Sequence, residues 1–182
     1  MLIILEGQRN VGKSTVIDAF IAQNSVRTSP FWGYKIKKFV IERKQYPVVS
    51  MMRDWLPLCF DRSNIWLLDR GSVTEQVYTE LTGREVTWTQ QEMAWAEYFL
   101  SLGGPLMFYL KCDADILMQR QVATGKPSEG DIDEISRLFD IYIKRTPLTN
   151  YTIDVTGRSI DSVVKIIENY SFSVFKNRKE IP

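Results

Sequence analysis

The residues with the clearest chemistry lie near the start of the chain, where positions 7–14 read GQRNVGKS. This spacing fits G-x-x-x-x-G-K-[ST], in which the two glycines let the backbone turn so that successive N–H groups point inward. A lysine at position 13 would reach phosphate oxygens, and the hydroxyl at position 14 would ligate Mg²⁺. The pattern predicts a polyphosphate cradle whose nucleotide-binding residues are Gly7, Asn10, Val11, Gly12, Lys13, Ser14 and Thr15.

The flanking segments are those that such a cradle needs. Residues 1–6 (MLIILE) form a continuous apolar run of strand length, which is typical of a strand buried on both faces. From Lys13 to Asn24 the apolar residues recur at helical spacing. The order is therefore strand, glycine loop and helix, and the positive end of the helix dipole would face the phosphates.

A second pair of chemical interest is Asp69-Arg70. Asp69 ends the apolar run 64–69 (NIWLLD), which is the position of a carboxylate beside the phosphate loop. Phosphoryl transfer uses a carboxylate near the metal and a fixed guanidinium near the moving phosphate. The pair could instead be a solvated strand end, but the glycine loop favours the functional interpretation, with Ser14 and Asp69 as metal ligands and with Lys13, Asp69 and Arg70 as catalytic residues.

The composition excludes several other chemistries. The chain has no histidine, so a Ser-His-Asp triad, an imidazole base and a histidine-bound metal are ruled out. Its two cysteines, Cys59 and Cys112, stand too far apart for a zinc module and suggest a reducing compartment. The net charge of +1 gives no global attraction to nucleic acid or membrane, and no apolar run approaches a bilayer span. We expect a soluble, cytoplasmic protein without a signal peptide.

The 182 residues, 45% of them apolar, fit a single domain over residues 1–182. Short apolar strands alternate with helices, which predicts an α/β three-layer sandwich with a mostly parallel sheet. The expected strands are 1–6, a short one at 26–28, 64–69, 106–110 and 151–155; the expected helices are 13–24, 48–60 with a break at Pro57, 71–81, 89–102, 113–123, 132–144 and 160–170. The residues from 171 onward are expected to be frayed.

Two segments stand out as loops. Residues 27–46 are aromatic, basic and poorly periodic, and positions 27–44 hold six basic residues against one acid, with aromatic rings between them. Such a mixture is typical of nucleic-acid contact, although the rings of a solvated loop could equally pack on the core. Residues 124–130 (TGKPSEG) have the composition of a mobile surface loop.

These motifs together resemble the thymidylate kinase-like nucleoside and nucleoside monophosphate kinases, especially small phage-type members. The resemblance rests on Leu5-Glu6-Gly7 leading into the glycine loop and on Leu67-Leu68-Asp69-Arg70 with Tyr78 in the next helix. It continues at fold level through Tyr109–Asp113 with Arg120, and through a last strand that enters Thr156-Gly157-Arg158. It implies a P-loop kinase fold that uses ATP and Mg²⁺ and, as in many relatives, a homodimer.

The resemblance also implies roles for individual residues. Asp69 would manage Mg²⁺ or the acceptor's proton, and Arg70 would bind the acceptor or the γ-phosphate. Arg120 would lie against adenine or reach the phosphates, so it joins the catalytic residues. The backbone at Gly157 would frame the adenine edge. Residues 124–130 would form a lid with Lys126 as its cation, or else a plain surface loop.

The acceptor side departs from the family pattern. Thymidylate kinases usually carry an aspartate at the third loop position, where this chain has Arg9, and a guanidinium suits a phosphate better than a hydroxyl. The family's Arg-Glu-Pro-Gly acceptor loop is also missing, and 27–30 (RTSP) stands in its place. The predicted acceptor-binding residues are Arg9, Arg53, Arg70, Trp32 and Tyr34.

Three functions follow as hypotheses. The leading one is an ATP-dependent kinase acting on a free (deoxy)nucleoside monophosphate. The second is a kinase that phosphorylates a hydroxyl carried on DNA, such as 5-hydroxymethyluracil, with the basic stretch 27–44 contacting the polymer. The third is a nucleotide-binding module without transferase activity.

Overall fold

The computed structural model describes residues 1–26, 28–31, 33–39, 47–83, 85–86, 88–125 and 130–179. Its centre is a five-stranded sheet in the order β2-β3-β1-β4-β5, in which every pair of neighbouring strands is parallel. The strands are β1 (Leu2–Glu6), β2 (Lys35–Phe39), β3 (Asn64–Asp69), β4 (Leu106–Lys111) and β5 (Thr149–Asp154). The predicted parallel α/β architecture is confirmed.

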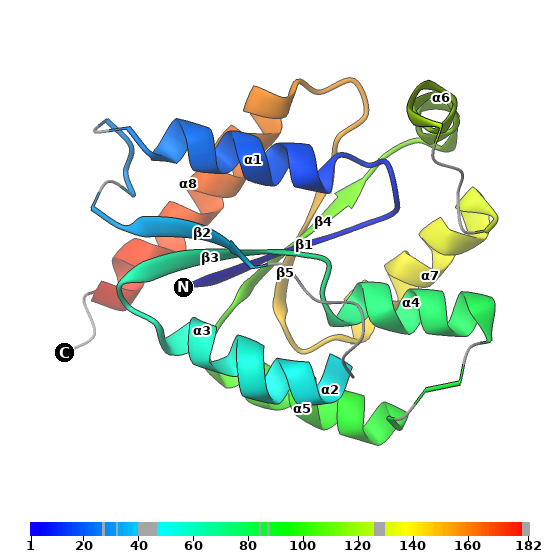
Figure 1. The fold of residues 1–182 in the computed structure, drawn as a ribbon, viewed down its shortest axis with the longest axis horizontal. Helices are drawn as coiled ribbons and strands as arrows, with labels where there is room; N and C mark the ends of the chain where they lie inside the picture. The colour runs from blue at the N-terminus through cyan, green and yellow to red at the C-terminus, as the bar shows by residue number, and fades with distance from the viewer. Residues whose placement is uncertain are drawn as a thin grey trace.

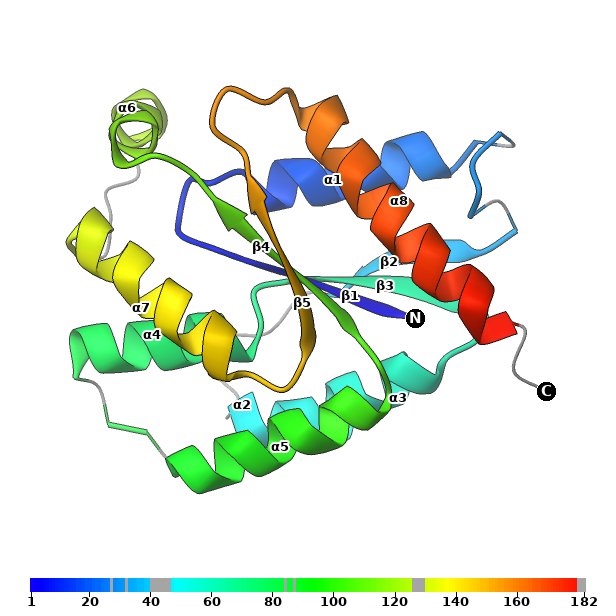
Figure 2. The ribbon, with the colours of Figure 1, turned by 180° about the vertical axis from the view of Figure 1, so that it is seen from behind.

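Helices cover both faces of the sheet (Figures 1 and 2). On one face lie α1 (Lys13–Asn24) and α8 (Ile160–Lys179); on the other lie α2 (Pro47–Ser50), α3 (Leu56–Phe60), α4 (Ser72–Thr82), α5 (Gln90–Leu102) and α7 (Ile132–Arg145). The helix α6 (Ala114–Thr124) follows β4 beyond its carboxyl end. None of the helices that the structure describes is long and apolar enough to cross a membrane.

The central strand β1 is buried on both faces, which explains its unbroken apolar sequence. Ile3 and Leu5 pack into the core under α1 and α8, whereas Leu2 and Ile4 pack into the core on the opposite face. In the register, Leu5 lies beside Asp69 of β3. The glycine loop after β1 and the residues that end β3 are therefore neighbours at the carboxyl edge of the sheet.

The stretch predicted as a loop contains the edge strand β2, and the short strand expected at 26–28 does not form at the described residues 26 and 28. Positions 35–39 (KIKKF) alternate too weakly to signal a strand. They become one through parallel pairing with β3, from Lys35 beside Asn64 to Phe39 beside Leu68. Tertiary pairing thus overrides a weak local preference.

The helix predicted over residues 48–60 forms in three parts. A π-helical turn over Met51–Trp55 joins α2 to α3, and Pro57 lies in the first turn of α3, where its missing N–H is not needed. Met51 and Trp55 are buried in the core beneath this layer. The proline therefore starts a helix here rather than ending one, and the π-turn accommodates the change.

The expected fraying after residue 170 is wrong for the described residues, because α8 continues to Lys179. Ser171 is fully buried, and the ring of Phe172 meets the buried Phe31 edge-on with centroids 6.1 Å apart. Packing against the segment before β2 extends the helix, which local sequence could not reveal.

Candidate functional site

The glycine loop has the backbone conformation that its sequence predicts. Gly7 has a φ of 139°, and a Cβ there would lie 2.5 Å from the carbonyl oxygen of Leu110. Gly12, the residue before α1, has a φ of 104°, and Asn10 has a φ of 65°. Only glycine fits at position 7, because both the dihedral angle and the neighbouring backbone exclude a side chain.

Lys13 lies across this loop. Its side chain is buried, and its Nζ donates to the carbonyl oxygens of Gly7 at 2.7 Å and Gln8 at 2.8 Å. Burial, together with the nearby Arg70 guanidinium, lowers the pKa of Lys13 to about 8. An anion in the loop would restore the charged form, so the ammonium group is poised to bind phosphate.

Ser14 and Asp69 meet at the start of α1. The Ser14 hydroxyl donates to Asp69 Oδ2, which joins the first turn of α1 to the end of β3. A hydroxyl and a carboxylate are oxygen ligands of the kind Mg²⁺ prefers, and the ion completes its shell with water and substrate phosphates. Among the described residues no cluster of three or more His, Cys, Asp or Glu could hold a metal.

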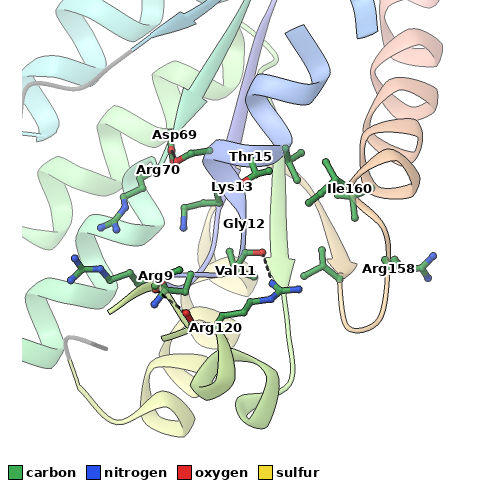
Figure 3. Close-up of a pocket in the computed structure, with 16 residues that line it drawn as sticks. Arg9, Val11, Gly12, Lys13, Thr15, Asp69, Arg70, Arg120, Arg158 and Ile160 are labelled. Atoms are coloured by element: carbon green, nitrogen blue, oxygen red, sulfur yellow. Dashed lines mark hydrogen bonds between the residues drawn. The ribbon is translucent and has the colours of Figure 1, made fainter. Parts of the chain in front are cut away.

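Arg70 has a strained backbone. Its φ is 75°, a left-handed conformation that few residues other than glycine adopt. Its N–H donates to the carbonyl of Leu5 at 2.9 Å, and its guanidinium carbon lies 5.7 Å from the centroid of the Tyr78 ring. This conformation turns the side chain to the same side of the sheet edge as Lys13 (Figure 3).

These residues line a pocket of about 630 Å³ at the carboxyl edge of the sheet (Figure 3). Its wall comprises the loop and first turn of α1 over 9–16, the end of β3, two residues of α6 and part of the segment 155–163. Arg120 donates to the carbonyl of Val11 at 3.1 Å, so α6 is tied to the loop. Basic residues outnumber acidic ones among the described lining residues. Asp69 is the acid, and the basic residues are Arg9, Lys13, Arg70, Arg120 and Arg158. The pocket suits a highly charged anion.

The structure brings most of the predicted residues together. Arg9, Asn10, Val11, Gly12, Lys13, Ser14, Thr15, Asp69, Arg70 and Arg120 all line the pocket. Gly7 forms the base of the loop, and Gly157, with a φ of 65°, lies between the lining residues Val155 and Arg158.

Two predicted acceptor residues lie elsewhere. Arg53 is outside the pocket lining, and its Nε pairs with Asp54 at 2.7 Å. Tyr34 packs against the core between the sheet and α1. Trp32 and positions 126–129, which include Lys126 of the expected lid, fall outside the described residues. Of the expected lid, Thr124 lines the pocket.

Sequence reasoning missed two residues of this region. Arg158 lines the pocket, and its Nε donates to the carbonyl of Asp154 at 2.7 Å. Glu6 is fully buried behind the glycine loop, where its carboxylate accepts N–H groups from Val73 and Thr74. The sequence signal for Glu6 was an acidic residue at the end of an otherwise apolar strand.

The described part of the basic stretch is engaged with the fold. Phe31 is fully buried, and Phe39 packs edge-on against Trp66. Lys37 lies over the same Trp66 ring at 4.8 Å, and Lys38 pairs with Asp18 at 3.3 Å. Among these residues the rings pack on the core, as the alternative interpretation of the stretch expects.

No protein-family model matches the chain, and no curated protein matches it by sequence. Its shape, however, is similar to solved structures over almost its whole length. The YorR protein from Bacillus subtilis, solved with phosphorylated GDP, superposes with a TM-score of 0.66 at 22% identity, with each chain covered completely. The fold is that of the P-loop nucleotide kinases.

Two further structures extend the similarity. Thymidylate kinase from Candida albicans gives a TM-score of 0.52 at 16% identity and covers 98% of this chain and 92% of its own. Deoxyadenosine kinase from M. mycoides, solved with dCMP and dCDP, gives 0.54 at 14% identity and covers 96% and 100%. The nucleotide kinase fold thus persists at low identity.

Proposed function

We propose that the chain is an ATP- and Mg²⁺-dependent kinase that transfers the γ-phosphoryl group to a nucleotide-type acceptor. One observation carries the proposal: Lys13 spans the glycine loop and Ser14 meets Asp69 in a single pocket whose remaining charges are arginines. The nucleotide kinase fold of the structural neighbours supports it.

We assign ATP, the phosphoryl donor, to the glycine loop. The loop amides and Lys13 would hold its phosphates, and Ser14 and Asp69 would hold Mg²⁺, which would neutralise phosphate charge. Arg120 and Gly157 lie on the side of the pocket toward α6 and the 155–163 segment, where the adenosine would rest.

The transfer itself needs positioning more than covalent chemistry. An acceptor phosphate oxygen attacks the γ-phosphorus in line, and the bond to the β–γ bridging oxygen breaks, so that ADP leaves with its electron pair. Lys13, Arg70 and Arg120 neutralise the charge spread over the moving group. Asp69 serves the metal or the acceptor's proton.

For the acceptor we favour a free (deoxy)nucleoside monophosphate. Arg9 and Arg70 line the pocket together, and two guanidinium groups suit the dianionic phosphate of a monophosphate. The DNA hypothesis depends on aromatic rings free to stack on bases, yet Phe31 is buried and Phe39 packs on Trp66. These contacts weigh against a polymer acceptor.

A panel of acceptors tests the proposal. Labelled ATP with Mg²⁺ is offered with each deoxynucleoside monophosphate, with plain DNA and with 5-hydroxymethyluracil DNA, and Lys13→Ala serves as the blank. The proposal expects label on at least one monophosphate and none on DNA. Label on hydroxymethylated DNA alone would favour the second hypothesis, and ATP binding without any transfer would favour the non-catalytic module.

We also propose that the chain forms a homodimer through α5. Opposite its buried side, α5 exposes Trp95, Tyr98 and Leu102 at the alternating spacing of a helix-packing seam, and no charge lies between Glu92 and Leu102 except the buried Glu97. Phe99 of α5 and Phe60 of the adjoining α3 are also exposed, so these two helices carry four exposed aromatic rings. An uncharged face suits a second copy, because a two-fold axis brings like residues together.

Light scattering after size exclusion tests the dimer. The wild type should have twice the chain mass, the double variant Trp95→Arg/Leu102→Glu should have one chain mass, and Val26→Arg, at an exposed apolar residue outside α5, should remain dimeric. A monomeric wild type at micromolar concentration would contradict the proposal.

A further inference from the structure

The first turn of α4 is held from outside by two buried carboxylates. Glu6 at the end of β1 accepts the N–H of Val73 at 3.1 Å, the N–H of Thr74 at 3.2 Å and the Thr74 hydroxyl. Glu97 of α5 accepts the Ser72 hydroxyl and, at 3.1 Å, the amide of Gln76. Three consecutive residues, 72–74, are therefore fixed by carboxylates from two other elements.

Glu6 replaces a local helix cap. The residue before α4 is Gly71, which offers no side chain to the unpaired N–H groups of the first turn. The Glu6 carboxylate satisfies two of them and places negative charge at the positive end of the helix dipole. A Cβ on Gly71 would lie 2.7 Å from Glu6 Oε1, so the backbone passes directly against the carboxylate.

Arg70 comes two residues before the start of α4 and has an unusual backbone conformation. Its left-handed φ of 75° persists only where the surroundings fix the chain on both sides. On one side its own N–H is bound to the Leu5 carbonyl at 2.9 Å. On the other side the chain runs within two residues into the turn that Glu6 and Glu97 hold.

Holding the turn in this way carries an electrostatic cost. Burial raises the pKa of Glu6 to about 7 and also raises the pKa of Glu97, because both lose hydration as charged groups. Apolar residues of similar size would avoid that cost but would leave the first-turn N–H groups of α4 without this acceptor. Two carboxylates whose charged forms are costly to bury hold the turn next to a strained arginine. Such local departures from the most stable arrangement accompany functional sites.

We infer that Glu6 and Glu97 are positioning residues that hold Arg70 in its left-handed conformation, with its guanidinium directed into the phosphate pocket. The inference rests on the proposed kinase function. Neither carboxylate lines the pocket, so they act through Arg70 and not on the reacting groups.

A double-mutant cycle tests this role. Glu6→Gln and Glu97→Gln are each made in the wild type and in Arg70→Ala, and kcat and KM are measured with the acceptor identified by the panel. In the wild type we expect kcat to fall by up to about 100-fold, with the KM for ATP little changed, because a misplaced group loses its effect on the transition state. On the Arg70→Ala background the same changes should lower kcat by less than about twofold.

Glu92→Gln is the matched control, because Glu92 also accepts a backbone N–H at a helix start, that of α5, but outside the pocket. Its kcat should equal that of the wild type. Equal losses on both backgrounds, or an unchanged kcat in both glutamine variants, would overturn the inference while the kinase function stands. A folded wild type without transferase activity would overturn both. Should Glu6→Gln fail to fold in thermal melting, Glu97→Gln alone decides the outcome.

Discussion

The glycine loop and the stretch made up of the described residues between 28 and 60 differ in what determines their structure. In the loop, each unusual dihedral angle belongs to a residue that tolerates it: Gly7 and Gly12 have positive φ, and so does Asn10. In the later stretch, β2 is a strand because β3 lies beside it, and Phe31 is buried because α1 and α8 cover it.

The difference shows where local sequence suffices. A phosphate cradle must be recognisable in about eight residues, because its backbone does the binding. An edge strand with three lysines takes its structure from its neighbours, so similar composition can be a loop in one fold and a strand in another. We therefore expect substitutions in and beside the glycine loop to change catalysis or ATP binding. Substitutions in the stretch should change the free energy of unfolding or have no effect.

The largest effect is expected from replacing Arg70, which tests whether the residues at the end of β3 take part in catalysis. Arg70→Ala removes a guanidinium from the pocket and should lower kcat by roughly 10³–10⁵, about 4–7 kcal/mol of transition-state stabilisation. Initial rates with labelled ATP measure it. Arg137→Ala, which removes an exposed arginine paired with Glu134, is the control and should be unaffected. A loss of less than tenfold in Arg70→Ala would remove Arg70 from the mechanism.

The next largest effect is expected on stability, from a core substitution in the stretch between residues 28 and 60. Phe31→Ala empties a fully buried site between Phe20 and Phe172 and should cost about 3–5 kcal/mol of unfolding free energy. Urea unfolding measures the loss, and kcat per folded molecule should not change. Val122→Ala, at a largely exposed side chain, should cost far less. If Phe31→Ala is as stable as the wild type, the ring is not part of the core and the comparison of the two regions breaks down.

A pair of glycine variants compares the glycine loop with the end of α4, where Gly83 also has a positive φ. Gly83→Ala places a Cβ at a positive φ in open space and should cost about 1 kcal/mol. Gly7→Ala adds a contact of 2.5 Å with the Leu110 carbonyl and should cost about 3 kcal/mol, with loss of ATP binding. Thermal melting with and without ATP compares them. Equal costs would mean that the loop relaxes freely and is not held rigid by β4.

The smallest effect is expected from the lysines of β2. Lys37 lies over Trp66 and Lys38 pairs with Asp18, and such surface contacts contribute at most about 1 kcal/mol each. Replacing Lys35, Lys37 and Lys38 with glutamine should leave kcat and KM for a monophosphate unchanged. A KM that rises more than fivefold would place β2 in the acceptor site.

The sequence was sufficient for features that rest on short patterns. The apolar runs located β1, β3 and β4, and the helix expected over 89–102 forms as α5. The loop and Asp69-Arg70 were brought into one pocket as predicted, because parallel strands end at one edge of the sheet.

What could not be predicted depended on contacts between distant segments. Lys35–Phe39 needed β3 as a partner, and the end of α8 needed the Phe31 ring. Arg53 has the residue type of an acceptor ligand, yet its pairing with Asp54 outside the pocket follows from the π-turn at 51–55, which no local signal announces. Glu6 was visible as an acid, but its capping of α4 depends on where β3 leads the chain.

The central claim is that the glycine loop binds a nucleoside triphosphate with its magnesium ion, and isothermal titration calorimetry of ATP with Mg²⁺ into the folded chain tests it most directly. The account predicts saturable binding at one site per chain, abolished by Lys13→Ala, whose melting temperature should match that of the wild type. The absence of any heat from ATP or GTP with well-folded wild type would contradict it.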